Sequence, residues 1–222
     1  MKRQPEPELM DIEAEAEAYA VANFSDVNQA FVDRLVELAG DGPHVVALDL
    51  GTGPGDIPIR LLRARPQWRV CAIDASFPML RFGRSAAERP ARPRFVLSDA
   101  KRLPFADATF DVVLSNSILH HINDVAPFWN EVRRIARPGG FVLLRDLFRP
   151  ESEAAAHRIV ETYSGRESAL LKEEFFRSLL AAYTAEEVRE QVQAAGLGAL
   201  DVVRVTDRHM DIFGRLATTS SE

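Results

Sequence analysis

A short glycine-rich loop is the first segment of this sequence whose composition points to ligand binding. Glycines alternate with other residues over positions 51–55, and Asp49 and Asp56 bound the loop. Because glycine lacks a Cβ atom, the pattern indicates either close approach of a ligand to the backbone or an ordinary tight turn. The apolar run at 45–50 just before the loop is typical of a buried parallel strand. A glycine loop after such a strand favours ligand binding.

A further carboxylate follows the next apolar run. Asp74 ends the segment 69–74, and a spacing of about twenty residues from a glycine loop is where a nucleotide-binding sheet places an acidic residue. A carboxylate at this position can accept hydrogen bonds from both hydroxyl groups of a ribose. The glycine loop and Asp74 together predict a ligand that contains adenosine.

The charge of the loop distinguishes between adenosine ligands. A dinucleotide places its diphosphate at the N-terminus of the helix behind the loop. Asp56 stands where the dinucleotide fingerprint has its third glycine, and its charge would repel a diphosphate. The sulfonium and ammonium groups of S-adenosylmethionine are cationic, so an acidic loop suits this cofactor better. Capping of the helix by Asp56 is an alternative interpretation that is compatible with the first.

Five segments, taken in order, resemble the class I S-adenosylmethionine-dependent methyltransferases. They are 48–55 with its acid-x-Gly-x-Gly-x-Gly pattern, 72–76, 98–100, 103–113 and 137–140. The resemblance implies a Rossmann-like α/β fold with a doubly wound, seven-stranded, mostly parallel sheet. Its last strand would run antiparallel, and helices would cover both faces.

The resemblance also implies which residues hold S-adenosylmethionine. Gly51 and Gly53 would line its methionine portion, and Asp74 would hold the ribose. Ala75 would border the adenine, and Asp99 would read the adenine edge together with the Ala100 amide. From chemistry alone, a role for Asp99 as a turn residue stays open. The predicted cofactor-binding set is Asp49, Gly51, Thr52, Gly53, Asp74, Ala75, Asp99, Ala100 and Asn116.

The acceptor of the methyl group should lie beyond the fourth and fifth strands, because ligands of such sheets bind outside the carboxyl ends of the strands. Imidazole titrates near neutrality, so we predict His120 as the catalytic base and His121 as a substrate-binding residue, with a packing role open for either. Asp146 and Arg149 are predicted to bind a polar substrate, and a mutual ion pair is the alternative.

The residues after Asn116 bear on the class of acceptor. Methyltransferases that act on amino groups of nucleic-acid bases or glutamine often carry Asn/Asp-Pro-Pro-aromatic here, and Ser117 and Ile118 stand where the prolines would be. This departure weighs against those acceptors and favours a small molecule. No cluster of histidine, cysteine and carboxylate has the sequence spacing of a metal site, so we predict no metal.

The elements that position these residues alternate along the chain. Strands are predicted at 45–50, 69–74, 94–98, 111–115 and 141–145, helices at 6–22, 26–39 and 76–88, and a closing hairpin at 200–205 and 209–213. Ser25 is a possible N-cap, and 138–140 is predicted as a turn. We expect a single domain over 1–222, with N-terminal helices in 1–40, a cofactor-binding core in 44–150, a helical cap in 151–195 and the hairpin in 199–214.

The composition excludes several classes of protein. A formal net charge of -6 over 222 residues argues against a nucleic-acid partner. The single cysteine, Cys71, forms no internal disulfide, and the sequence has neither a membrane span nor a positively charged leader, so a cytoplasmic location is expected. Two alternatives to a methyltransferase remain: a nicotinamide-dependent oxidoreductase, and a non-catalytic protein that binds S-adenosylmethionine as a partner or sensor.

Overall fold

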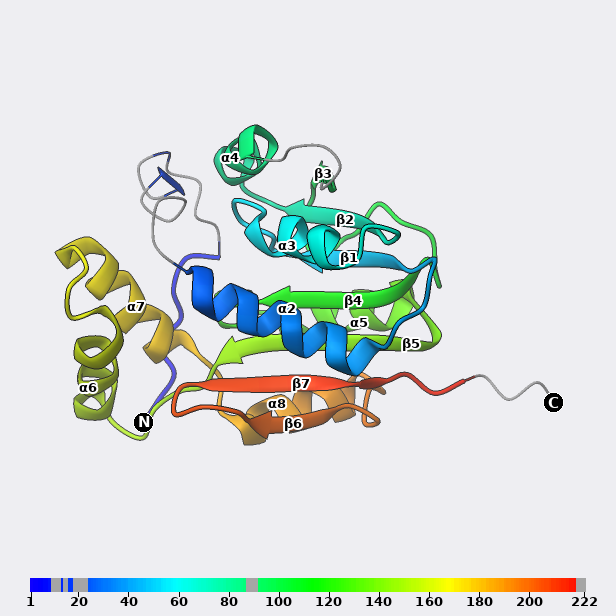
Figure 1. Ribbon diagram of the computed structural model, residues 1–222. Coiled ribbons are helices and arrows are strands. Elements are labelled where there is room, and N and C mark those ends of the chain that lie inside the picture. Colours follow the sequence, from blue (N-terminus) through cyan, green and yellow to red (C-terminus); the bar gives the residue numbers. More distant parts are fainter. Residues whose placement is uncertain (9–12, 14–15, 18–23, 87–91, 219–222) are drawn as a thin grey trace.

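The computed structural model describes residues 1–8, 13, 16–17, 24–86 and 92–218. Its centre is a seven-stranded sheet with the strand order β3-β2-β1-β4-β5-β7-β6 (Figure 1). The strands are β1 Val46–Leu50, β2 Arg69–Asp74, β3 Arg94–Leu97, β4 Phe110–Asn116, β5 Ala136–Leu147, β6 Asp201–Arg204 and β7 His209–Arg215. Pairing is parallel from β3 through to β5, and β7 is antiparallel to both β5 and β6. The predicted fold class is confirmed.

Helices pack on both faces of this sheet. They are α2 Ser25–Ala39, α3 Asp56–Ala64, α4 Phe77–Ala86, the 3-10 helix η1 Leu119–His121, α5 Val125–Ile135, α6 Glu153–Ser164, α7 Ala169–Ala181 and α8 Ala185–Ala194. Residues of α2 and α3 share a core with Val112 and Leu114 of β4, whereas residues of α5 and α8 share a second core with Val113. Successive side chains of a strand point to opposite faces, which explains why β4 is apolar at the consecutive positions 112–114.

The segment 151–195 contains two different structures. Helices α6 and α7 pack against each other at the carboxyl end of β5, close to the N-terminus (Figure 1). Helix α8 contacts β6 and α5 and is the crossover helix that leads to the next strand. Among the described residues, no helix combines the length and apolar character needed to cross a membrane.

The N-terminal prediction differs from the structure. Residues 1–8 contain no helix, so a helix that begins at position 6 is wrong, and most of the remainder of that predicted helix lies outside the described residues. Helix α2 begins at Ser25 itself, and the N-cap position belongs to Phe24, whose side chain makes no capping bond. The Ser25 hydroxyl instead accepts a hydrogen bond from Arg60 Nη2 at 3.1 Å.

Strand β5 is longer than predicted because it contains the expected turn. Pro138, Gly139 and Gly140 lie inside the strand, and the register with β4 shifts between the pairs Phe110–Ala136 and Val112–Phe141. Gly139 has a φ of 73°, which the absence of a Cβ atom permits. The extra residues form a bulge, which bends the strand without ending it.

The connection from β3 to β4 contains no helix. Residues 98–109 form turns and bends instead. Arg134 of α5 donates hydrogen bonds to the Phe105 carbonyl at 2.7 Å and the Leu103 carbonyl at 3.2 Å. Glu131 accepts a hydrogen bond from the Leu103 amide at 2.6 Å. Side chains of α5 therefore satisfy the backbone groups that a helix would have paired.

A capping box at the start of α8 gives a stability prediction. Thr184 Oγ1 accepts from the Glu187 amide at 3.2 Å, and Glu187 Oε2 accepts from the Thr184 amide at 2.8 Å. Thr184→Ala is expected to lower the free energy of unfolding by about 1 kcal/mol because it removes one of these bonds. Urea denaturation measures the change, and Thr162→Ala on the exposed face of α6 is the control. Equal stability of both variants would contradict the prediction.

Candidate functional site

A cavity of about 520 Å³ opens at the carboxyl ends of β1, β2 and β4. Its lining includes every residue that was predicted to hold the cofactor: Asp49, Gly51, Thr52, Gly53, Asp74, Ala75, Asp99, Ala100 and Asn116. Parallel strands end at one edge of the sheet, so loops that are distant in sequence meet there. The cavity has the place in the fold that the sequence predicts for a ligand.

The glycine loop allows other backbone and side chains to come close. Gly51 has a φ of 66°, and a Cβ atom added there would lie 2.7 Å from the Ile118 side chain. Gly55 has a φ of 77° and occupies the N-cap position of α3, and a Cβ atom there would meet the Phe95 ring at 2.7 Å. Both positions require glycine for the conformation and for the space.

Asp74 is held at the cavity wall by backbone amides. Its Oδ2 accepts from the Gly53 amide at 2.8 Å, and its Oδ1 accepts from the Ser76 amide at 2.8 Å. Burial raises the pKa of Asp74, and the hydrogen bonds from these amides oppose that rise. A carboxylate fixed in this way keeps its remaining lone pairs available to ribose hydroxyl groups.

Asp49 is almost fully buried below the glycine loop. Its side chain accepts a hydrogen bond from Thr52 Oγ1 at 2.6 Å, and 1% of the residue is exposed. Burial raises the pKa of Asp49 to about 7, although the hydrogen bond from Thr52 opposes the rise. The carboxyl group is therefore protonated over much of the acidic range in the ligand-free protein.

The raised pKa of Asp49 predicts a dependence of stability on pH. The unfolded chain releases this proton near pH 3.8 and the folded chain near pH 7, so the contribution of Asp49 to the free energy of unfolding falls as the pH rises through that range. Asp49→Asn mimics the neutral form and is expected to reduce this loss. Urea denaturation of both ligand-free proteins at several pH values measures it, and parallel pH profiles would contradict the prediction.

Asp56 lines the cavity, but it does not cap α3 as the alternative interpretation proposed. Its Oδ2 accepts from Arg60 Nε at 2.7 Å and from Asn28 Nδ2 at 2.9 Å. Helix α3 has no side-chain cap bond. Arg60 offsets the charge of Asp56, so repulsion of a diphosphate by Asp56 is weaker than the sequence suggested. The spacing of four residues on a helix could have revealed the pair.

Asp99 makes a turn contact and also lines the cavity, and its role in binding adenine stays a prediction. Its Oδ1 accepts from the Lys101 amide at 2.8 Å, which is the turn contact.

After β4, Ser117 adopts a φ of 66°, which is uncommon for a residue with a side chain. The Ser117 amide donates to the Arg145 carbonyl at 2.8 Å, and this turn places Ile118 against the glycine loop.

The acceptor-side residues divide into two groups. His121 lines the cavity, whereas His120, Asp146 and Arg149 do not, and His120 is 3% exposed. The alternative of an Asp146–Arg149 ion pair is wrong. Asp146 Oδ1 lies 2.5 Å from His120 Nδ1, and Arg149 Nη2 donates to Glu187 at 2.7 Å. Asp146 lies in β5 and Arg149 lies in the loop that follows it, and the two side chains contact different partners.

The two histidines differ in their electrostatic environment. Burial disfavours a charge on His120, but the neighbouring Asp146 and Glu6 carboxylates outweigh it and raise the pKa of His120. Burial, together with the adjacent His120, lowers the pKa of His121 to about 3. His121 therefore presents a neutral imidazole to the cavity at physiological pH.

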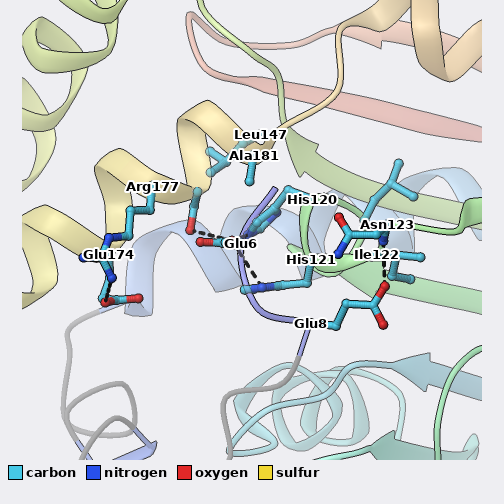
Figure 2. A network of polar contacts seen from close by, with 12 residues as sticks. Glu6, Glu8, His120, His121, Ile122, Asn123, Leu147, Glu174, Arg177 and Ala181 are labelled. Carbon is cyan, nitrogen blue, oxygen red and sulfur yellow. Dashed lines mark hydrogen bonds and ion pairs between the residues drawn. The ribbon is translucent and has the colours of Figure 1, made fainter. Parts of the chain in front are cut away.

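Glu6 is the site residue that the sequence did not reveal. Its Oε1 lies 3.2 Å from His121 Nδ1 and 3.6 Å from His120 Nε2, and Figure 2 shows it reaching toward both rings from the N-terminal segment. Burial raises the pKa of Glu6. One ligand atom from each of these three residues lies within 4.8 Å of the others, so the fold brings together three residues that could hold a metal ion, which the spacing in the sequence does not indicate.

The N-terminal segment is attached beside this cluster by several bonds. Arg3 donates to the Ala181 carbonyl of α7 and, at 2.9 Å, to the His120 carbonyl. Its guanidinium stacks on the Tyr183 ring at 4.1 Å. Glu8 accepts from the Asn123 amide at 2.8 Å and pairs with Lys101 at the cavity wall. Local sequence patterns carry no signal for such contacts, because the partners lie far away along the chain.

The sequence is similar to known methyltransferases over part of its length. The family model described as a methyltransferase domain matches residues 48–144. A demethylmenaquinone methyltransferase of Roseiflexus sp. (strain RS-1) is 38% identical over 104 residues, which are 47% of this chain and 43% of that protein. A malonyl-[acyl-carrier protein] O-methyltransferase of Xylella fastidiosa (strain M23) is 35% identical over 127 residues, which are 57% of this chain and 42% of that protein.

The similarity to solved structures extends over the whole fold. The crystal structure of a putative S-adenosyl-L-methionine-dependent methyltransferase from Methanococcus maripaludis superposes with a TM-score of 0.71 at 18% identity, with 99% of each chain covered. This match concerns the fold. The chain spans less than half the length of the two curated relatives. The segment that matches the family model, 48–144, contains the glycine loop, Asp74 and Asp99.

Proposed function

We propose that the protein is a class I methyltransferase that transfers the methyl group of S-adenosylmethionine to a small-molecule acceptor, with residues 48–144, which match the model of a methyltransferase domain, as the part that binds the cofactor. The observation that carries the proposal is the cavity at the carboxyl ends of the strands. There the glycine loop, the amide-bound Asp74 carboxylate and Asp99 line one space. This arrangement offers acceptors for ribose hydroxyl groups and, at the loop, close approach to the backbone.

Several observations support a small molecule as the acceptor. The two curated relatives are named for methylation of demethylmenaquinone and of malonyl-acyl carrier protein. The formal net charge of -6 disfavours a nucleic acid. The buried Cys71 is compatible with a reducing compartment, and we keep the cytoplasm as the proposed location.

Methyl transfer mainly requires the protein to align the acceptor with the methyl group of the cofactor. In the in-line displacement, the bond from the methyl carbon to sulfur breaks while the bond to the acceptor forms, and the thioether leaves without a proton. An acceptor that carries a proton must lose it, and we propose His120 for this role, with the proton reaching its buried ring past the adjacent His121, which lines the cavity. The bond to Asp146 fixes Nδ1 as the donor, so Nε2 is left to take the proton. His121 lines the space in which the acceptor would bind.

A screen for formation of S-adenosylhomocysteine tests this function. The full chain is incubated with S-adenosylmethionine and a set of quinols, phenols, thiols, amines and carboxylic acids, and the product is quantified by mass spectrometry. Turnover of at least one acceptor well above the level without acceptor supports the proposal. Binding of the cofactor with no turnover across the set would favour the non-catalytic alternative.

A further inference from the structure

We propose that Glu6, His120 and His121 bind a divalent transition-metal ion, such as Zn²⁺, at the acceptor side of the cavity. The three residues come from two distant parts of the chain: the N-terminal segment and the η1 turn after β4. Their ligand atoms lie within 4.8 Å of one another, and Figure 2 shows their side chains converging. Two imidazoles and one carboxylate form a donor set that suits zinc or iron better than magnesium or calcium.

The distances between the ligand atoms fit one ion. Zinc binds nitrogen and oxygen at about 2.0–2.2 Å, so two ligands of a tetrahedral ion lie about 3.3–3.6 Å apart. Glu6 Oε1 lies 3.2 Å from His121 Nδ1 and 3.6 Å from His120 Nε2. The ligand atoms of the two histidines lie within 4.8 Å of each other, so an ion that all three residues bind requires the imidazoles to adjust to the spacing of a tetrahedral ion.

One of these ligand atoms is buried without a hydrogen bond. His121 Nδ1 has no hydrogen-bond partner among the described residues, and its contact with Glu6 at 3.2 Å counts only as an ion pair. An unsatisfied buried polar atom costs about 1–3 kcal/mol in a protein. Coordination of an ion would satisfy His121 Nδ1 and would neutralise the Glu6 carboxylate, which is 7% exposed.

The surroundings orient two of the three ligands. His120 Nδ1 lies 2.5 Å from Asp146, which leaves Nε2 toward the cluster, and the Ser178 hydroxyl donates to Glu6 Oε1 at 3.3 Å. Metal-bound histidines commonly donate their second nitrogen to a carboxylate in this way. With three protein ligands, a tetrahedral ion keeps one open position, and His121 places the cluster at the cavity wall.

The ion would change the role of His120 from base to ligand. An acceptor oxygen bound at the open position would lose its proton more readily, because a bound divalent cation lowers the pKa of an oxygen ligand. This consequence rests on the proposed methyl transfer, whereas the metal site itself does not. Metal binding and cofactor binding can thus be measured separately on the same protein.

Calorimetric titration of the chelator-treated full chain with Zn²⁺ tests the site. We expect the wild type to bind one ion per chain. In Asp146→Asn the affinity for Zn²⁺ should fall about 10- to 100-fold, because Asp146 does not bind the ion itself but orients the ligand His120. Glu6→Gln keeps the shape but removes the ligand charge, and its affinity should fall further. Glu37→Gln and His44→Ala, both at exposed positions away from the cluster, are controls that should bind as the wild type does.

Cobalt and cofactor titrations complete the test. Co²⁺ bound by the wild type should give the intense visible absorption of a four-coordinate ion, and Glu6→Gln should lose it. No stoichiometric Zn²⁺ binding by the wild type, or equal affinity of Glu6→Gln with an unchanged melting temperature, would overturn the proposal. If S-adenosylmethionine binds while Zn²⁺ does not, only the metal site fails; if Zn²⁺ binds while the cofactor does not, the proposed function fails instead.

Discussion

Replacement of His120 by asparagine is expected to lower kcat for methyl transfer by about 10²- to 10⁴-fold, which is the range for loss of a positioned acid–base group. The affinity for S-adenosylmethionine should be unchanged, because His120 lies outside the lining of the cavity that holds the predicted cofactor residues. We expect kcat to fall both if His120 takes the proton itself and if it holds an ion that activates the acceptor. Steady-state kinetics with an acceptor found in the screen, together with calorimetric cofactor binding, measures both quantities.

Two further variants make the His120 result specific. His157→Asn changes an exposed histidine of α6 that stacks on Phe176, and its kcat should equal that of the wild type. Asp146→Asn keeps the shape of the positioning residue but can no longer hold His120 in one tautomer, so kcat should fall with little change in KM for the cofactor. Wild-type kcat in His120→Asn would remove this imidazole from the mechanism.

Replacement of Asp74 by asparagine is expected to weaken binding of S-adenosylmethionine about 100-fold. Two hydrogen bonds from ribose hydroxyl groups to a carboxylate are together worth about 3 kcal/mol, and 1.4 kcal/mol corresponds to a tenfold change in Kd. The amide also cannot accept at both of its atoms, so it loses one of the present bonds to Gly53 and Ser76. Calorimetric titration measures the change in Kd.

The control for Asp74 is Asp41→Asn, which alters an exposed carboxylate paired with Arg65. Its Kd for the cofactor should match that of the wild type. Thermal melting of the Asp74→Asn protein shows whether the fold is retained, and the weak binding is then assigned to the lost carboxylate. An unchanged Kd in Asp74→Asn would place the ribose elsewhere.

The strands that carry the cofactor site could be predicted because they are buried on both faces. Continuous apolar runs locate β1 and β2 to within a residue, and parallel pairing brings the ends of such strands to one edge of the sheet. The side chains of Asp49 and Asp74 then reach the cavity as a consequence of topology. Their positions follow from the local sequence and from the rule that ligands of such sheets bind at the carboxyl ends of the parallel strands.

The acceptor side could be predicted only in part. His120 and His121 follow a strand end and were found in that way, but the partner of His120 depends on how β4 and β5 pair side by side. Glu6 approaches from residues 1–8, a segment without regular structure, and no periodicity indicates where such a segment docks. The bulge in β5 was missed for a related reason: proline and glycine favour a turn locally, and the pairing with β4 overrides that preference.

The measurement that tests the central claim most directly is isothermal titration of the full chain with S-adenosylmethionine and S-adenosylhomocysteine, with a reduced nicotinamide dinucleotide as the comparison. We expect one site per chain for the adenosyl ligands with a micromolar Kd, about -8 kcal/mol, and no heat of binding for the dinucleotide. Binding of the dinucleotide without the adenosyl ligands would contradict the methyltransferase assignment and favour an oxidoreductase.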